Sequence, residues 1–178
     1  MPRPRILRYL SGLVGPAEAE DLTQLVFLKV SAALSDFRGD ASLGTWIYRI
    51  ARNAALDWRR SVSRAADVQG QLADVEQTET LAAADTRAPD EALMQRDMRQ
   101  CLGGIVQQLP ESYREVLTLR DVDGLSNADV ADALGLSLAA VKVRLHRARG
   151  RLRRTIVDRC QISRDGRRGL TCERKPPS

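Results

Sequence analysis

The chain has 178 residues, of which 43% are hydrophobic and only 4% aromatic, with a formal net charge of +5 and a pI of about 9.6. Ala and Leu supply most of the apolar content, which favours helices over strands, and the basic balance suits a polyanionic partner. No apolar run approaches a bilayer-spanning length, no signal peptide is recognisable, and three cysteines make no disulfide framework, so we expect a cytoplasmic protein without membrane insertion.

Charge divides the chain into two basic modules, an acidic segment between them and a basic tail. Residues 1–64 carry ten basic against six acidic residues, and residues 92–158 carry eleven against eight. Residues 65–91 carry one Arg against seven acidic residues and no aromatics, which is typical of a flexible linker. We therefore predict an all-α fold with two small helical domains, 1–64 and 92–158, joined by the linker 65–91 and followed by a tail, 159–178.

The first module reads as three helices. A helix over about 4–13 ends at Gly15-Pro16, and a second helix runs over about 17–34. Its predicted core-facing stripe consists of Leu22, Leu25, Val26, Val30 and Ala33. A polar loop over 36–42 precedes a third helix, over about 43–60, whose polar face is basic: Arg49, Arg52, Asn53, Arg59 and Arg60.

The rare aromatics of the third helix, Trp46, Tyr48 and Trp58, have two interpretations. They can pack in the core, or they can stack on unpaired bases beside arginines, as single-stranded DNA binding requires. The sequence alone leaves both open.

The second module ends in a helix-turn-helix. Helices over about 90–108 and 111–121 precede it. Ser126 is placed to cap the next helix with Asp129 in a capping box, Gly135 ends that helix, and Ser137 caps the last one. One apolar seam is expected to join the two helices: Val130, Leu134, Leu138, Val141, Leu145 and Leu152.

The last helix carries a dense basic face, which in this motif enters a DNA major groove. A solvated basic helix end would explain its final arginines alone. It would not explain the capped helix, the glycine turn and the basic face together, so we predict DNA binding.

Two runs of residues resemble a known family. Residues 19–27, 37–42 and 45–53 look like region two of bacterial sigma factors of the extracytoplasmic-function type, and residues 109–114 and 124–149 look like their region four. The resemblance implies a protein that binds core RNA polymerase, directs it to promoter DNA and helps to open the duplex. It also implies that an anti-sigma factor can hold the free protein inactive.

The resemblance assigns roles residue by residue. It implies polymerase binding by Asp21, Gln24 and Leu28. It implies capture of the minus-ten strand by the loop, with Arg38 and Asp40, and by Trp46, Arg49, Arg52 and Asn53. It implies reading of the minus-thirty-five duplex by Ala139, Lys142, Val143, Arg144, His146 and Arg147.

Other functional classes are less well supported by the sequence. One His, no Gly-rich phosphate loop and no clustered nucleophile and base argue against an enzyme, and we predict no cofactor. The alternatives are a helix-turn-helix regulator that does not act through core polymerase and a protein-interaction adaptor. The tail reads as an irregular basic end; Cys160 and Cys172 are weak candidates for a metal or thiol sensor.

Overall fold

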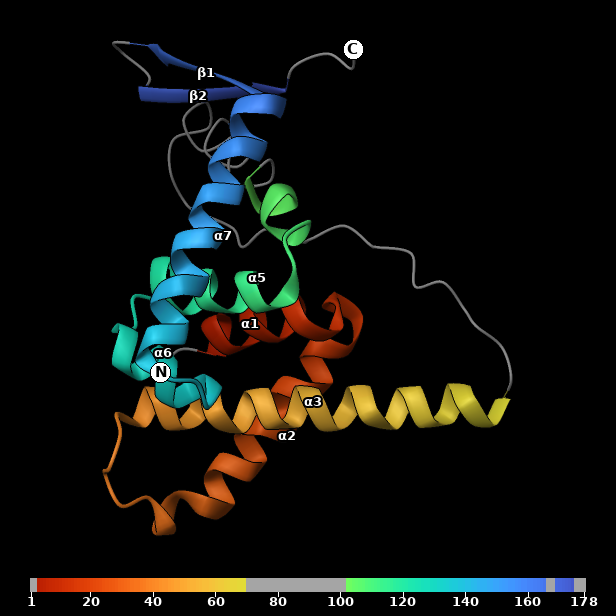
Figure 1. Cartoon of the computed structure of the whole chain (residues 1–178). Helices are drawn as coiled ribbons and strands as arrows, with labels where there is room; N and C mark the ends of the chain where they lie inside the picture. The colour runs from red at the N-terminus through yellow and green to blue at the C-terminus, as the bar shows by residue number, and fades with distance from the viewer. Residues whose placement is uncertain (1–2, 70–101, 166–168, 175–178) are drawn as a thin grey trace.

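A computed structural model describes residues 3–69, 102–165 and 169–174, with side chains described for 3–65 and 102–160 (Figure 1). The first module contains helix α1 (Arg3–Val14), α2 (Pro16–Ala33), a short 3-10 turn η1 (Leu34–Asp36) and α3 (Leu43–Gln69). In the second, residues 102–107 are helical, and α5 (Glu111–Leu117), a π-helical turn η2 (Thr118–Val122), α6 (Asn127–Leu134) and α7 (Leu138–Arg159) follow. Strands β1 (Cys160–Asp165) and β2 (Gly169–Arg174) close the chain.

The predicted helices of the first module are present, but α3 is longer than expected. Gly15, with φ of 96°, separates α1 from α2 as predicted, and α2 begins at Pro16, one residue before the predicted start. α3 continues nine residues past 60, to Gln69, because residues 61–69 contain neither glycine nor proline to end it. The predicted domain boundary at 64 therefore falls inside a helix. The predicted helix over 90–108 lies largely outside the described residues.

The predicted helix over 111–121 changes its hydrogen-bonding pattern midway. α5 gives way to η2, whose end is marked by the Asp123 N–H donating to the carbonyl of Thr118 at 2.9 Å. This wider turn precedes Gly124, which has φ of 78°. The turn sets the position of Asp123, whose side chain faces the first module.

The two modules pack on one another around one core. Figure 1 shows α6 against one end of α3 and α1 beside α5, and direct contacts join both pairs. The shared core includes buried side chains from each module, among them Ile6, Leu10, Val26, Tyr48, Val116, Leu119, Val130 and Val141. The predicted fold class holds for both helical modules, but they form a single packed body in this structure.

Two predicted core positions are wrong. Leu25 is 43% exposed on α2, and Leu138, at the start of α7, is 45% exposed. When the apolar stripe of a helix is wider than the surface that packs against it, the residues at the edge of the stripe stay exposed to solvent.

The tail is not irregular. β1 and β2 pair antiparallel, with Cys160 opposite Arg174 and Ile162 opposite Cys172. Apolar and polar residues alternate in Cys160–Ser163 and Gly169–Cys172, which is the period of a strand, but the runs are too short to stand out. No helix in the described part of the chain is long and apolar enough to cross a membrane.

Candidate nucleic-acid interface

The helix-turn-helix forms with the predicted caps. The backbone N–H of Asp129 donates to Ser126 Oγ at 3.0 Å, and the backbone N–H of Ser126 donates to Asp129 Oδ2 at 3.3 Å. Gly135 adopts the left-handed conformation, with φ of 62°, and the N–H of Ala140 donates to Ser137 Oγ at 3.1 Å. Three local devices therefore fix the angle between α6 and α7.

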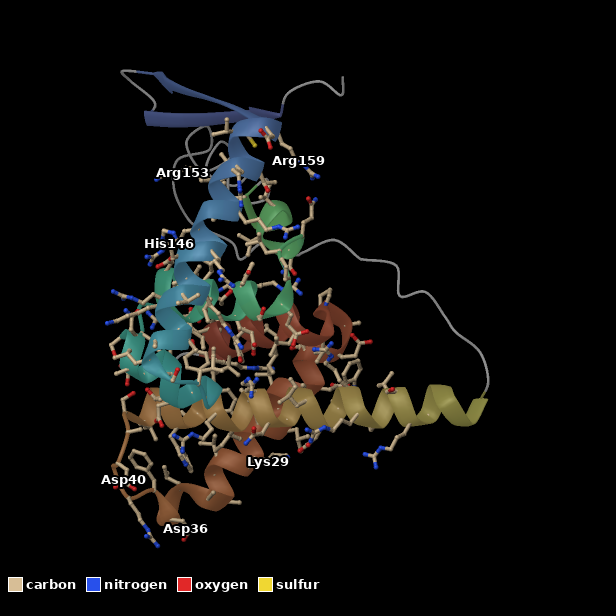
Figure 2. The ribbon with its side chains drawn as sticks, in the orientation of Figure 1. Lys29, Asp36, Asp40, His146, Arg153 and Arg159 are labelled. Carbon is tan, nitrogen blue, oxygen red and sulfur yellow. The ribbon has the colours of Figure 1, made fainter. Side chains whose placement is uncertain are left out.

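α7 separates its apolar and basic faces. Val141, Leu145 and Ala148 are buried, and they hold the helix against α5 and α6. The predicted duplex-reading residues lie outside: Ala139, Lys142, Val143, His146 and Arg147 are exposed and Arg144 is half-buried. Among the described residues, the side chains of Lys142, Arg144, His146 and Arg147 have no hydrogen-bonding partner, so their donors remain available to another molecule. Figure 2 shows His146 and Arg153 along this helix.

Not every arginine of α7 is available. Arg149 donates two hydrogen bonds to the Asp121 carboxylate, from Nε at 3.0 Å and from a terminal nitrogen at 2.6 Å. This pairing raises the pKa of the Arg149 guanidinium. Arg149 thus ties α7 to the turn that follows α5, as a structural contact within the second module.

A shallow hollow lies beside the basic face of α7. Its volume is about 620 Å³, and it is lined by Tyr113, His146, Arg147, Gly150, Arg151 and Arg154. The lining carries three guanidinium groups, which bind phosphate oxygens through paired donors. The hollow extends the cationic surface about two turns past Arg147, the last of the predicted duplex-reading residues.

In the first module, the loop before α3 is exposed and carries Arg38 and Asp40. Figure 2 shows Asp36 and Asp40 on this loop at the far end of α2, away from α7. The Phe37 and Trp46 rings meet with centroids 5.2 Å apart, and Trp46 is half-buried. Trp46 therefore packs on the loop and keeps part of its ring open, so neither sequence interpretation of it is excluded.

Two of the predicted strand-capturing residues already have partners in the second module. Arg49 pairs with the Asp132 carboxylate, and Arg52 Nε donates to Glu115 Oε1 at 3.2 Å. Asn53 is exposed next to them. The partners of these arginines were not predicted, because only the packing of the modules brings α3 to α5 and α6.

Two buried carboxylates of the second module are each satisfied by a tyrosine and an arginine of the first. Asp123 accepts from the Tyr48 hydroxyl at 2.6 Å and from Arg8, while Glu115 accepts from the Tyr9 hydroxyl at 3.1 Å and from Arg52. The two phenol rings pack edge to face with centroids 5.3 Å apart. Burial, and then the neighbouring carboxylate, raise the pKa of both tyrosines well above the usual value.

The predicted polymerase-binding residues form one exposed surface on α2. Asp21 and Gln24 are exposed, and Leu28 is 69% exposed one turn further along. Leu25, predicted to be buried, joins them. Leu25 and Leu28 thus add exposed apolar side chains to the polar surface of Asp21 and Gln24.

The described side chains do not assemble a metal site. No three His, Cys, Asp or Glu side chains within the described part gather closely enough to hold an ion. Cys160 is buried at the end of α7. The Cys172 side chain lies outside the described ones, so the proposed sensor pair is untested.

Both modules match known protein families. Sigma-70 region 2 matches residues 2–65, and sigma-70 region 4 matches residues 99–152. The chain is 32% identical over 146 residues to the RNA polymerase sigma factor SigZ of Bacillus subtilis, covering 82% of this chain and 77% of that protein. It is 31% identical to the ECF RNA polymerase sigma-E factor of Escherichia coli (strain K12), with the same coverage of both chains. The chain belongs to the extracytoplasmic-function sigma factors of bacterial RNA polymerase.

A solved structure of this family has a similar fold. The sigma factor RpoE from Bartonella quintana, crystallised with the anti-sigma factor NepR, aligns with a TM-score of 0.69 and 25% identity over 85% of this chain and 89% of that chain. As a member of this family, the 178-residue chain directs RNA polymerase to promoters. The alternative function considered from the sequence, a helix-turn-helix regulator that does not act through core polymerase, is not favoured. Helices α1–α3 belong to region 2, and the helical residues 102–107 with α5–α7 belong to region 4.

Proposed function

We propose that the exposed face of α7 reads the minus-thirty-five element as duplex DNA, through Lys142, Arg144 and Arg147, with Ala139, Val143 and His146 beside them. The observation that carries this assignment is that the side chains of Lys142, Arg144, His146 and Arg147 have no partner among the described residues, on a helix held by caps at both ends of the turn. Ala139 and Val143 allow close approach to base edges, and arginine and lysine can donate to guanine and to phosphate.

The first test uses holoenzyme and a promoter selected from a random duplex library. Replacing Lys142, Arg144 and Arg147 with Ala should abolish preferential binding to that promoter. The control replaces Arg3, Arg60 and Arg64 with Ala, which removes the same charge from exposed positions of region 2. Equal promoter preference in both triple variants would contradict the assignment.

Region 2 would capture the displaced minus-ten strand with α3 and its preceding loop. Arg49, Arg52 and Asn53 lie on one side of α3, and Arg38 and Asp40 lie on the exposed loop whose Phe37 packs against the half-buried Trp46. A cation beside an exposed ring suits an unstacked base and its phosphate. Permanganate probing of thymines with holoenzyme carrying Arg49→Ala and Arg52→Ala should show duplex binding without strand opening.

Asp21, Gln24 and Leu28 would bind the core polymerase. Their exposure on α2, with Leu25 alongside, supports this role, since none of them contributes to the buried core. We also propose that the protein acts without enzymatic activity and in the cytoplasm, where core polymerase and promoter DNA are found.

An anti-sigma factor is the further partner that we propose. The support is the similarity to Bartonella quintana RpoE, which was crystallised with the anti-sigma factor NepR. Co-purification from the native cell should recover a stoichiometric protein that is neither core polymerase nor a chaperone. Its absence, together with constitutive activity of the purified protein, would contradict this proposal.

A further inference from the structure

The π-helical turn η2 is fixed within region 4 by hydrogen bonds and by burial. A π-helical turn holds one more residue than an α-helical one, which gives the side chains after it new directions. The N–H of Leu125 donates to the carbonyl of Leu119 at 3.0 Å, and the Arg120 guanidinium donates to the carbonyl of Leu125 at 3.0 Å. Leu119 is completely buried. η2 is therefore a fixed point from which a side chain can position its neighbours.

Asp121 projects from this turn and binds Arg149 on α7. Arg149 Nε and one terminal nitrogen donate to different oxygens of the Asp121 carboxylate, at 3.0 Å and 2.6 Å. Two parallel hydrogen bonds between planar groups fix the relative orientation of the groups as well as their distance. The Asp121–Arg149 pair thus connects η2 to the middle of the helix that carries the proposed duplex-reading residues.

The apolar packing of α7 does not by itself set the rotation of the helix about its axis. The buried residues of α7, which are Val141, Leu145 and Ala148, are aliphatic, and apolar contact has no preferred direction. The surface of a helix lies about 6 Å from its axis, so a rotation of about 30° moves that surface by about 3 Å. Successive bases of a DNA strand are about 3.4 Å apart along the duplex. A rotation of this size would therefore direct the exposed side chains of α7 to different bases.

We infer that Asp121 and Arg149 are positioning residues for promoter recognition, because their pair sets the rotation of α7 about its axis. The inference rests on the proposed reading of the minus-thirty-five element by Lys142, Arg144 and Arg147. Arg149 lies about 3 Å past Arg147 and about 10 Å past Lys142 along the helix axis. The pair is thus close to the side chains whose direction it controls, and it acts through them without binding DNA itself.

Two simpler roles for the pair predict different results. A pair that only stabilises region 4 would have a small effect, because the Arg149 and Asp121 side chains are 53% and 38% exposed and surface ion pairs contribute little to stability. An arginine that binds a DNA phosphate would bind every duplex more tightly once the competing carboxylate is removed. A positioning pair predicts the opposite, since loss of the carboxylate releases α7 and weakens binding to the correct bases.

The test removes the carboxylate and keeps the size of the side chain. Asp121→Asn leaves one acceptor oxygen and places an NH₂ group against the guanidinium. The matched control is Asp57→Asn, which removes the same charge from an exposed ion pair with Arg60 in region 2. Fluorescence anisotropy at one salt concentration gives the Kd of each holoenzyme for the selected promoter and for an unrelated duplex of equal length. The ratio of these two Kd values is the promoter preference.

Asp121→Asn should lower the promoter preference about tenfold, as expected when one two-point contact with a base is lost. The control should keep the native preference, and the two variants should have similar urea midpoints, since each loses an exposed ion pair. Selection from the random duplex library with the Asp121→Asn holoenzyme should return a changed set of preferred bases, which a loss of stability alone would not produce. An unchanged preference, or equally tighter binding to both duplexes, would overturn the inference.

Two further variants keep the inference testable if Asp121→Asn folds poorly. Asp121→Arg with Arg149→Asp reverses the pair and restores opposite groups that can form two parallel hydrogen bonds. The reversed pair should recover most of the promoter preference, even where the carboxylate on α7 weakens binding to every duplex. Arg149→Lys keeps the charge without the planar fork, so it should lose preference as Asp121→Asn does. Native preference with Arg149→Lys, or no recovery in a reversed pair with a native urea midpoint, would overturn the inference.

The same assay separates this inference from the proposed function. If the holoenzyme with Lys142, Arg144 and Arg147 replaced by Ala keeps its promoter preference, the proposed reading role of α7 is wrong. If that triple variant loses its preference and Asp121→Asn does not, the reading role stands and the positioning role is wrong.

Discussion

The hydroxyl of Tyr48 on α3 donates a 2.6 Å hydrogen bond to the carboxylate of Asp123, 75 residues later in the other region. Both side chains are buried, and Arg8 binds the second oxygen of the same carboxylate. A buried carboxylate requires such donors, because an unpaired one bears the full cost of lost hydration. This relationship makes Tyr48 a core residue that joins the regions, which favours the packing interpretation of its side chain over base stacking.

Tyr48→Phe should destabilise the packing of region 2 against region 4. The substitution keeps the ring and removes the hydroxyl, so the Asp123 carboxylate loses one of its donors at a cost of about 1.5–3 kcal/mol. Urea denaturation followed by circular dichroism measures the change. Tyr113→Phe is the matched control, because the Tyr113 hydroxyl has no hydrogen-bonding partner among the described residues, and it should stay within about 0.5 kcal/mol of the native protein. Equal effects of the two substitutions would show that the Asp123 bond contributes nothing.

Stability should fall steeply in alkali. Burial raises the pKa of Tyr9 and Tyr48 in the folded protein, so their stabilisation is complete below the unfolded value, about 10, and is lost as pH rises above it. Each tyrosine contributes a slope of up to about 1.4 kcal/mol per pH unit. Urea unfolding at pH 9, 10 and 11 should show this decline in the native protein and a shallower one in the Tyr9→Phe, Tyr48→Phe variant. Parallel declines would contradict the assigned pKa shifts.

Local structure was predictable because its determinants are local. Ser126 with Asp129, the left-handed Gly135 and the Ser137 cap each act within a few residues, and all three formed as expected. The packing of region 4 on region 2 was not predictable, since the acids that meet Arg49 and Arg52 are spread over α5 and α6 and look like a solvated face in sequence. The prediction that Leu25 is buried was wrong for a related reason. Helical periodicity shows which residues share an apolar stripe, but it does not show how much of that stripe the neighbouring helices cover.

Asp21 and Gln24 should matter for polymerase binding and not for folding. Both side chains are exposed, and neither forms a hydrogen bond or ion pair among the described residues. Replacing both with Ala should weaken binding to core polymerase at least tenfold while the urea midpoint stays unchanged. Glu18→Ala with Glu20→Ala, on the same helix, is a control with acidic side chains removed nearby. A lowered midpoint would show that the pair is structural instead.

Arg151 and Arg154 should contribute phosphate contacts that carry no sequence information. They line the hollow beside α7, one to two turns past Arg147, where a backbone following the major groove would pass. Replacing each with Ala should weaken holoenzyme binding to the selected promoter and to unrelated duplex by similar factors, and reduce the salt slope by about 1 per contact. Arg144→Ala should instead weaken holoenzyme binding to the selected promoter more than binding to unrelated duplex. A selective loss with Arg151→Ala or Arg154→Ala would place them among the base-reading residues.

Cys160 should resist modification while the protein is folded. Its side chain is only 4% exposed at the junction of α7 and β1, and an oxidant or alkylating agent reacts with a thiolate that it can reach. The β1–β2 register sets Cys172 opposite Ile162 and Cys160 opposite Arg174, so the two cysteines are offset by two positions and not directly paired. Disulfide formation would then require the strands to shift, and metal binding would require ligands that the described side chains do not gather. Iodoacetamide labelling followed by mass spectrometry should modify Cys160 slowly in buffer and rapidly in urea.

Transcription with core polymerase should be equal with and without oxidant or zinc, for the native protein and for Cys160→Ser with Cys172→Ser. A loss of activity on oxidation that the double variant lacks would restore the tail as a redox sensor.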